Sequence, residues 1–389
     1  MVTIFTSIYN RKYIIEKLYN SLKVQSDHNF EWIIVDDGST DDVFPLLEKW
    51  KKEENNFSIK LKQVQNGGKH RAINLGVQMA SHEAFYIVDS DDFIPEDAIS
   101  FINIHFPSIS ENKGFAGIAG LIYSYKRNAC IGGSTYFEQY VDATNLEREQ
   151  YGLLGDKAEV YKTSVLKKYP FPEFPNENFL TEDIVWNRIA KDGLRLRWYN
   201  KKLYYCEYLE DGLTNQGNDC FIRNPRGWAR RITDAESYKF WTRERVDSEK
   251  FFFYEMMYDN FTEDEMCELL HLDTSAYKII NTKYMNILTE IKRIFKKNNW
   301  NSVVIYGFGT WGNRLLVYLK KLDIAVSYVI DKDPQKVRNY PAYRLEEDLP
   351  DTSNVCIAMK RNDPNVRVAL QEKLIHSSIW KLNEVVKEF

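Results

Sequence analysis

The chain has 389 residues, and its 52 basic and 56 acidic side chains leave a formal net charge of −4. This length predicts two or three domains, because a single hydrophobic core rarely serves a chain of that size. Apolar residues at 44% and charged residues at 28% are ordinary globular values, which argues against overall disorder, collagen and coiled coil. The near-neutral charge argues against a nucleic-acid partner.

No stretch approaches 18 consecutive apolar residues, and the first residues do not resemble a signal peptide. Five cysteines occur without C-x-x-C spacing, which predicts neither a zinc site nor a disulfide framework. These features favour a cytoplasmic protein. Aromatic residues reach 14%; they stack on sugars in some proteins but fill cores more often.

The N-terminal third alternates strand and helix signals. Strands are predicted at Val2–Thr6, Trp32–Val35, Leu61–Val64 and Phe85–Val88, and helices at Tyr13–Val24, through Trp50 and at Ala72–Met79. This order predicts a mainly parallel sheet, in which ligands bind at the carboxyl ends of the strands. Short strands and loops follow to about residue 212, and a polar helical region extends over 213–297. A second, small α/β domain is predicted for 298–389.

Two aspartates flank a serine at the end of the predicted strand Phe85–Val88. In extended chain, residues i and i+2 point the same way, so Asp89 and Asp91 can face one ligand. Mg²⁺ typically takes one or two carboxylates together with phosphate oxygens of a substrate. The alternative is an acidic turn that caps the following helix. From the spacing alone, both interpretations stay open.

Two further turns carry chemistry-bearing side chains. Asp36-Asp37-Gly38-Ser39-Thr40-Asp41 is good turn and cap chemistry, and a carboxylate there also suits a base or a ribose. Asn66-Gly67-Gly68-Lys69-His70-Arg71 places glycines and two cations before a helix, an arrangement that favours phosphate. It lacks the spacing of a Walker A loop. His70 by itself is interpreted as structural.

Four motifs then occur in a specific order: Ser7-Ile8-Tyr9-Asn10, Asp36 to Ser39, Gly68 to Gly76, and Asp89 to Asp92. This order resembles family 2 glycosyltransferases of the GT-A fold, with Ser7 where the family usually has proline. The later segment Thr181-Glu182-Asp183-Ile184-Val185-Trp186 resembles the acidic motif on the family's acceptor side. The resemblance implies a GT-A domain over 1–212, with a nucleotide-binding half (1–100) and an acceptor half (101–212).

The resemblance also implies roles for individual residues. Seven of them would contact the nucleotide sugar: Ser7, Tyr9, Asp37, Lys69, Arg71, Asp89 and Asp91. Among these, Asp37 would pair with a uracil edge, and Asp89 with Asp91 would hold Mg²⁺ or Mn²⁺. Asp183 would be the general base for the acceptor hydroxyl, with Glu182 contacting the acceptor. From spacing alone, an acidic first turn of a helix is the favoured interpretation of Glu182 and Asp183, and the resemblance reverses it.

Two basic segments follow the acidic motif. Arg223, Arg226, Arg230 and Arg231 lie within nine residues, as a solvated loop or as a flap that binds a diphosphate or a phosphorylated acceptor. The amphipathic segment Tyr284–Lys297 carries four cations on one side, which would suit the inner face of an anionic membrane. Packing between two domains is the alternative for this segment.

The C-terminal domain carries a dinucleotide-type fingerprint. A predicted strand runs into Gly307-x-Gly309-x-x-Gly312, then a helix, a second strand and Asp331. In this context the motif predicts a Rossmann-like fold. Fold is not function, and the 298–389 segment is short for a full dinucleotide domain. An accessory module, an NAD-like site and an oligomerisation role stay open.

The leading hypothesis is a metal-dependent, inverting glycosyltransferase. It would move a sugar from a nucleotide sugar, with UDP favoured, to a hydroxyl of a glycan, glycolipid or glycoprotein acceptor in surface polysaccharide or protein glycosylation. The first alternative is an NAD(P)-dependent oxidoreductase or nucleotide-sugar-modifying enzyme that uses the C-terminal domain. The second alternative is a non-enzymatic nucleotide sensor. The donor sugar, the acceptor and any homo-oligomer are not determined by the sequence.

Overall fold

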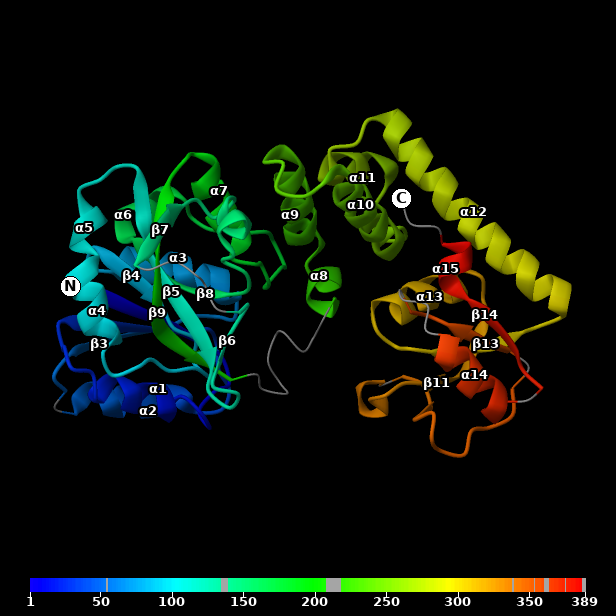
Figure 1. Ribbon diagram of the computed structural model, residues 1–389, viewed down its shortest axis with the longest axis horizontal. Coiled ribbons are helices and arrows are strands. Elements are labelled where there is room, and N and C mark those ends of the chain that lie inside the picture. The colour runs from blue at the N-terminus through cyan, green and yellow to red at the C-terminus, as the bar shows by residue number, and fades with distance from the viewer. Residues whose placement is uncertain are drawn as a thin grey trace. The chain divides into compact units, whose positions relative to one another are not determined.

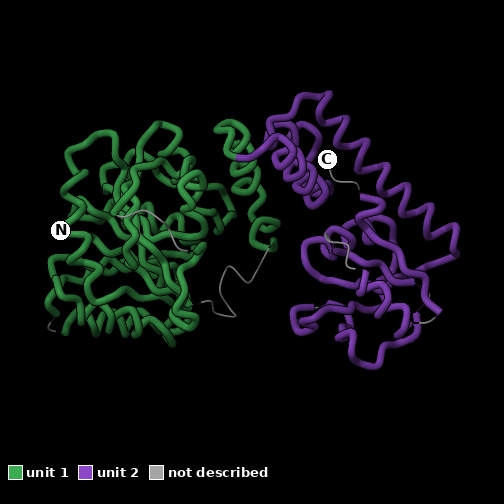
Figure 2. Tube along the Cα trace, viewed as in Figure 1, with its two compact units in different colours: residues 1–240 green, residues 241–389 purple. Residues whose placement is uncertain are grey.

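The protein divides into two compact units, residues 1–240 and 241–389 (Figures 1 and 2). The computed structural model describes residues 1–53, 55–133, 139–207, 218–337, 339–352, 354–359, 364–374 and 376–386. Each unit has its own sheet and its own set of covering helices. Within the described residues no helix is long and apolar enough to cross a membrane.

Unit 1 begins with the strand–helix alternation that the sequence predicts. Its first elements are β1 (Val2–Ile8), α1 (Glu16–Lys23), β2 (Phe30–Asp36), α2 (Val43–Lys52), β3 (Ser58–Gln63), α3 (Lys69–Met79), β4 (Ala84–Ile87), α4 (Ala98–His105) and α5 (Pro107–Ser110). The remaining elements are β5 (Phe115–Ser124), β6 (Ala129–Cys130), β7 (Tyr140–Ala143), η1 (Arg148–Tyr151), β8 (Lys157–Lys162), α6 (Thr163–Lys168), α7 (Asp183–Lys191), β9 (Arg195–Cys206), α8 (Asp219–Arg223) and α9 (Pro225–Ser237).

The main sheet of unit 1 has the strand order β3-β2-β1-β4-β8-β5-β9-β7, with β6 paired to β5. The strands β3, β2, β1 and β4 are parallel, as predicted. Beyond β4 the sheet is mixed, because β8 runs antiparallel to both β4 and β5 while β9 is parallel to β5. The carboxyl ends of β1, β2, β4, β5 and β9 therefore lie at the same edge of the sheet.

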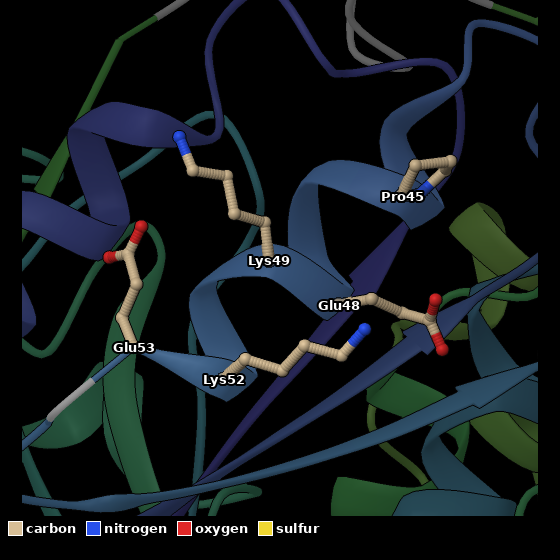
Figure 3. Close-up of a pocket in the computed structure, with 5 residues that line it drawn as sticks. All are labelled: Pro45, Glu48, Lys49, Lys52 and Glu53. Atoms are coloured by element: carbon tan, nitrogen blue, oxygen red, sulfur yellow. The ribbon is translucent and has the colours of Figure 1, made fainter.

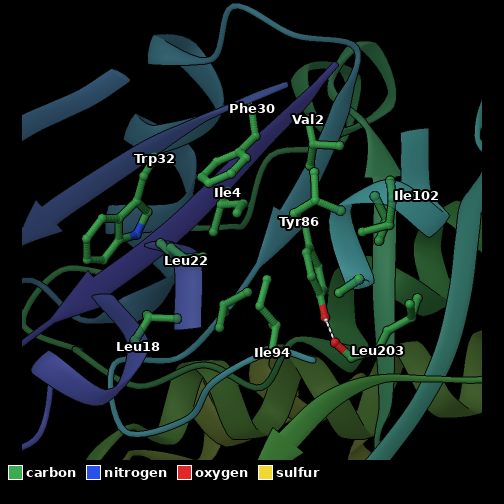
Figure 4. Close-up of a cluster of buried hydrophobic side chains, with 14 of the residues drawn as sticks. Val2, Ile4, Leu18, Leu22, Phe30, Trp32, Tyr86, Ile94, Ile102 and Leu203 are labelled. Atoms are coloured by element: carbon green, nitrogen blue, oxygen red, sulfur yellow. Dashed lines mark hydrogen bonds between the residues drawn. The ribbon is translucent and has the colours of Figure 1, made fainter. Parts of the chain in front are cut away.

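Helices cover both faces of this sheet. Alternate residues of β2 explain why, since Trp32 and Ile34 pack in one apolar cluster and Ile33 and Val35 in the other. Helices α1, α2 and α4 close the first cluster, and α3, α6 and α7 close the second. Figure 4 shows the first cluster, where the buried Tyr86 donates a hydrogen bond of 2.8 Å to the Leu203 carbonyl. The sheet is therefore covered by an apolar core on each face.

The arginine-rich segment is helical and belongs to unit 1. Pro225 occupies the first turn of α9, where its missing N–H costs nothing. The described part of the expected connector, 218–297, is shared between the two units, which divide after Phe240. This differs from the boundaries at 212 and 297 that the sequence suggests. The physical reason is contact, because α9 packs on α7 while the later helices pack on elements of unit 2.

Unit 2 starts with helices and ends with a parallel sheet. Its elements are α10 (Arg243–Met257), α11 (Glu263–Leu270), α12 (Thr274–Asn298), β10 (Ser302–Tyr306), α13 (Thr310–Lys321), β11 (Ala325–Ile330), η3 (Pro334–Lys336), β12 (Ala342–Tyr343), β13 (Asn354–Ile357), α14 (Pro364–Lys373), β14 (Ser378–Lys381) and α15 (Leu382–Val385). The strand order is β12-β11-β10-β13-β14, with all pairs parallel. In chain order this is 3-2-1-4-5, the order of doubly wound nucleotide-binding sheets.

A buried ion pair joins two helices of unit 2. The Arg314 guanidinium of α13 lies 2.8 Å from the Glu255 carboxylate of α10, and Tyr318 donates to the same carboxylate. The apolar face of α12, which includes Tyr284, Ile291 and Phe295, is also buried. The segment expected to touch a membrane therefore uses its apolar side chains inside the fold.

Candidate active site

The strand ends of unit 1 bring together four carboxylates from two distant segments. Asp89 and Asp91 follow β4, and Glu182 and Asp183 stand at the start of α7. The link between them is Lys69, the first residue of α3. Its Nζ lies 2.7 Å from Asp89 Oδ1 and 2.7 Å from Glu182 Oε1.

The charged groups of this cluster shift one another's pKa values. Burial lowers the pKa of Lys69, but the two carboxylates raise it by more, so the pKa lies above its usual value. Burial raises the pKa of Glu182, and the Lys69 ammonium outweighs it, so this carboxylate has a lowered pKa. Lys69 and both carboxylates remain partly exposed, with side-chain exposures of 28–39%. The cluster is therefore charged and open to a ligand.

The acidic loop after β4 is held by a tyrosine that the sequence did not single out. Tyr204 Oη accepts a hydrogen bond of 2.9 Å from the Asp89 N–H and donates one of 2.8 Å to Asp92. Burial, followed by the charges of Asp89 and Asp91, raises the pKa of Asp92 to about 8. Burial and Asp89 also raise the pKa of Asp91. Three acids crowded in one loop create a negative potential that a cation would relieve.

Asp183, the expected general base, has a hydrogen-bond donor on each carboxylate oxygen. Thr181 Oγ1 donates to Oδ1 at 2.5 Å, and Arg231 Nε of α9 donates to Oδ2 at 2.8 Å. The Asp183 side chain is 27% exposed. Glu182 and Asp183 thus contact different cations, Lys69 and Arg231, rather than forming only a helix-capping turn.

The acids after β2 are engaged by the fold itself. Asp36 is fully buried and accepts hydrogen bonds from the Ser39 N–H and the Gln63 amide. Asp37, expected near a uracil edge, is 3% exposed and accepts from the Gly67 and Gly68 N–H groups, each at 2.8 Å. Burial raises the pKa of Asp37 despite these two donors. These contacts show that Asp36 and Asp37 hold the turn after β2, and a nucleotide contact by Asp37 stays a prediction.

The glycines before α3 serve chain packing. Gly68 has a φ of +95°, and a Cβ on it would lie 2.0 Å from the Asn178 carbonyl oxygen. Arg71, expected near the diphosphate, donates instead to the carbonyls of Gly67, Phe174 and Glu177 at 2.5–2.6 Å. Arg71 thus fastens the chain before α7 to α3, and Lys69 is the cation of this motif that reaches the acidic cluster.

Ser7 and Tyr9 stand at the end of β1, beside the turn after β2. Ser7 is half-buried and Tyr9 is 48% exposed. The next residue, Asn10, has a φ of +52° and binds the second turn through its amide oxygen, which accepts from the Thr40 N–H at 2.7 Å. The Tyr9 side chain is thus accessible at the end of β1, and its contact with a nucleotide stays a prediction.

The remaining arginines of the basic segment have partners near α9. Arg230 pairs with Asp234 of the same helix at 2.8 Å, and the Arg226 guanidinium lies 3.9 Å from Glu177. Arg223 donates to the Asp219 carbonyl at 3.2 Å. The segment thus comprises the end of α8 and the first turns of α9, and the start of α9 is bound to the chain before α7.

A hollow on the outside of α2 is a separate feature. Figure 3 shows its lining, which is Pro45, Glu48, Lys49, Lys52 and Glu53. None of the candidate site residues lies among them. The hollow is therefore separate from the candidate site at the strand ends.

The glycine turn of unit 2 is formed as the fingerprint predicts, but its acid is engaged. Gly307 has a φ of +90°, and a Cβ on Gly312 would lie 2.4 Å from the Gly307 carbonyl oxygen. A Cβ on Gly309 would meet nothing within 4 Å. Asp331 accepts from the Phe308 and Asp333 N–H groups at 2.7 and 2.9 Å. The acid of the fingerprint therefore holds the turn together, and an NAD-like site remains one of the open predictions.

Comparison with known proteins identifies the first domain. Residues 3–102 match glycosyl transferase family 2. The chain carries a family 2 glycosyltransferase domain. The predicted α/β fold of GT-A type is thereby confirmed.

Two curated relatives share this glycosyltransferase domain. Glycosyltransferase GlyG of Streptococcus pneumoniae is 33% identical over 138 residues, which cover 35% of this chain and 43% of the relative. The poly(ribitol-phosphate) beta-N-acetylglucosaminyltransferase TarS of Staphylococcus aureus is 29% identical over 220 residues, covering 54% of this chain and 36% of TarS. The chain thus spans less than half the length of either relative in these matches.

Solved structures of two glycosyltransferases align over most of the chain. A crystal structure of S. aureus TarS with UDP-GlcNAc has 21% identity and a TM-score of 0.48, covering 83% of this chain and 88% of that chain. The mannosyltransferase PcManGT of Pyrobaculum calidifontis, in complex with GDP-Man and Mn²⁺, has 14% identity and a TM-score of 0.46, covering 82% and 86%.

Three residues of the candidate site contact the acids in a way that the sequence does not predict: Tyr204, Thr181 and Arg231. Thr181 belongs to the acidic motif and Arg231 to the arginine-rich segment, but neither is predicted to bind Asp183. Thr181 lies two positions before Asp183, where a short-range donor is common. Tyr204 and Arg231 required the fold.

Proposed function

We propose that unit 1 transfers a sugar from a nucleoside diphosphate sugar, with UDP as the favoured nucleotide, to an acceptor hydroxyl with inversion. The observation that carries the proposal is the Lys69 bridge, which places the acidic loop after β4 beside the acidic start of α7. A site for group transfer needs both halves, one for the leaving diphosphate and one for the attacking hydroxyl.

The residues fit the chemistry of a divalent cation. The described residues contain no group of three or more His, Cys, Asp or Glu side chains that could hold a metal. Asp89 and Asp91 supply two carboxylates, which is the number Mg²⁺ or Mn²⁺ typically takes when substrate phosphates complete the shell. When bound, the cation would supply charge neutralisation for the diphosphate.

Asp183 is the proposed general base, which takes the proton from the acceptor hydroxyl. The acceptor O–H bond breaks as the hydroxyl oxygen bonds to the anomeric carbon, and the proton passes to the Asp183 carboxylate. The bond between the anomeric carbon and the diphosphate oxygen breaks with its electron pair on the diphosphate. Attack from the face opposite the leaving group inverts the anomeric centre. A positioned base contributes about 10²–10⁴ in rate.

An aromatic surface beside the acidic loop supports a carbohydrate acceptor. Phe93 and Tyr205 stack at 4.9 Å, and Tyr125, which is 55% exposed, meets Phe93 edge-on at 5.1 Å. Lys17 Nζ lies 4.3 Å from the centre of the Phe93 ring and 2.7 Å from the Glu207 carboxylate, which neutralises its charge. Aromatic rings at an exposed surface suit a sugar or polyol chain. The name of TarS, which specifies poly(ribitol phosphate), is consistent with such an acceptor.

A donor screen tests the proposal. UDP- and GDP-sugars are incubated with Mn²⁺, with Mg²⁺ and with EDTA, and nucleotide release is measured. We expect release from a UDP-sugar, its loss with EDTA, and a strong loss in Asp91→Asn. Absence of release from every donor, or activity that EDTA leaves untouched, would contradict the proposal or its metal requirement respectively.

A further inference from the structure

Two side chains join the start of helix α9 to the chain that precedes Asp183 by hydrogen bonds. The buried Glu177 carboxylate accepts from the Arg226 N–H at 2.8 Å and from the Gly227 N–H at 2.9 Å. In return, the Asn224 side-chain oxygen accepts from the Asn178 and Phe179 N–H groups at 2.7 and 3.0 Å. These reciprocal bonds satisfy the free donors at the start of the helix.

Gly227 allows the helix to come this close. A Cβ at this position would lie 2.9 Å from Leu180 Cδ1 and 3.3 Å from the Phe179 carbonyl oxygen. Residues four apart share one face of a helix. Arg231 therefore lies on the face that Gly227 brings against the 177–180 segment, one turn further along α9.

Arg231 reaches the acid that this segment carries. Its Nε lies 2.8 Å from Asp183 Oδ2, and the two side chains are 26% and 27% exposed. Thr181 holds the other oxygen. A carboxylate has about four lone-pair sites, so two remain for an acceptor hydroxyl while the orientation of the group is fixed.

We propose that Arg231 is a positioning residue, which orients Asp183 for proton transfer and does not bind the donor diphosphate. The inference rests on the role proposed for Asp183. It separates Arg231 from the rest of the basic segment, whose arginines have partners other than Asp183. Misplacing a reacting group by about 1 Å costs on the order of 10² in rate, so loss of this contact lowers kcat.

The test is a double-mutant cycle on nucleotide release from the donor that the screen above identifies, with water as acceptor. We expect Arg231→Met to lower kcat about 10- to 100-fold with the donor KM within about twofold of wild type. Arg231→Lys, which keeps a cation, restores part of kcat. Arg231→Met combined with Asp183→Asn is no slower than Asp183→Asn alone, because Arg231 acts through Asp183.

Arg188→Met is the matched control. Arg188 lies on the same helix as Asp183, and its guanidinium is 5.3 Å from the Tyr169 ring centre. We expect wild-type kinetics from this variant, and thermal melting establishes that each variant is folded. If Arg231→Met does not fold, the cycle is run with Arg231→Lys.

Three outcomes would overturn the inference: an unchanged kcat, a raised kcat, or a raised donor KM with kcat retained. The last would make Arg231 a diphosphate ligand. Additive losses in the cycle would also overturn it. Failure of the proposed function looks different, since then the wild type releases no nucleotide or Asp183→Asn is as active as wild type, and the inference falls with it.

Discussion

The two units share a strand order but differ in the side chains that come after the fourth strand. Both sheets begin with the order 3-2-1-4. In both, an acid at the carboxyl end of the second strand accepts hydrogen bonds from the following turn: Asp36 is the last residue of β2, and Asp331 directly follows β11. In unit 1 the fourth strand, β4, is followed by Asp89 and Asp91, whereas in unit 2 it is followed by Ala358 and Met359. The two units therefore share a topology but not the acidic side chains that the proposed function assigns to this strand end.

The two units also differ in the solvent exposure of their charged side chains. The Lys69 cluster of unit 1 is 28–39% exposed, while Glu255 and Arg314 of unit 2 are 0% and 9% exposed. A partly open cluster can exchange partners with a substrate. A closed pair cannot, and its role is to hold α10 against α13.

The largest expected effect is on catalysis in unit 1. Asp183→Asn removes the proposed base while keeping its shape, so kcat should fall by about 10²–10⁴. Steady-state release of UDP measures the loss, and a thermal melt within about 2 °C of wild type excludes unfolding. If Asp183→Asn kept its activity, Asp183 would not be the base, and the proposed difference between a catalytic unit 1 and a structural pair in unit 2 would lose its support.

A second prediction concerns the buried pair of unit 2. Glu255→Gln leaves the Arg314 charge buried without its partner, which should cost about 3–5 kcal/mol of stability. The matched control is Lys321→Met, which breaks a more exposed pair with Asp259 and should cost less than about 1 kcal/mol. Urea unfolding measures both, and equal small effects would show that burial does not distinguish the two pairs.

A third prediction tests acid sensitivity close to the site. Burial, followed by the charge of Arg71, lowers the pKa of His70 from 6.5 to about 4. As the pH falls, the unfolded chain takes up this proton at a higher pH than the folded chain does. The contribution of His70 to folding stability is therefore fully present above pH 6.5 and is lost as the pH falls toward 4. The loss is about 3 kcal/mol.

His70→Gln should therefore show a shallower decline of unfolding free energy between pH 6.5 and 4 than wild type. His82→Gln serves as the comparison, because His82 is less buried and burial lowers its pKa as well. An identical decline in wild type and His70→Gln would mean that His70 has the same pKa in the folded and the unfolded chain, which would contradict the prediction.

The smallest effect compares two glycines of one turn. Gly307→Ala places a Cβ on a residue with a φ of +90°, 3.0 Å from the Ala358 carbonyl oxygen, and should cost about 1–2 kcal/mol. Gly309→Ala meets open space and should change stability by about 0.5 kcal/mol or less. Urea unfolding of the full chain measures both losses of stability. Equal losses would contradict the expectation that only position 307 disfavours a side chain.

Local patterns in the sequence determined a good part of this protein. The alternation of apolar residues predicted β1 to β4 and the helices between them, and the order of four motifs placed the acids at the strand ends. Such signals are readable because side-chain period and turn chemistry are properties of neighbouring residues. The same reasoning predicted the glycine turn of unit 2.

The tertiary structure alone decided which of these residues are available. Asp37 and Asp331 look like ligands in the sequence, yet backbone N–H groups from nearby turns satisfy them. Lys69 and Arg71 are two positions apart, but one meets two carboxylates and the other three carbonyls. Arg231 and Asp183 are 48 positions apart. Hydrogen bonds and charges act through space over a few ångströms, so no local pattern records which partners the fold brings within that reach.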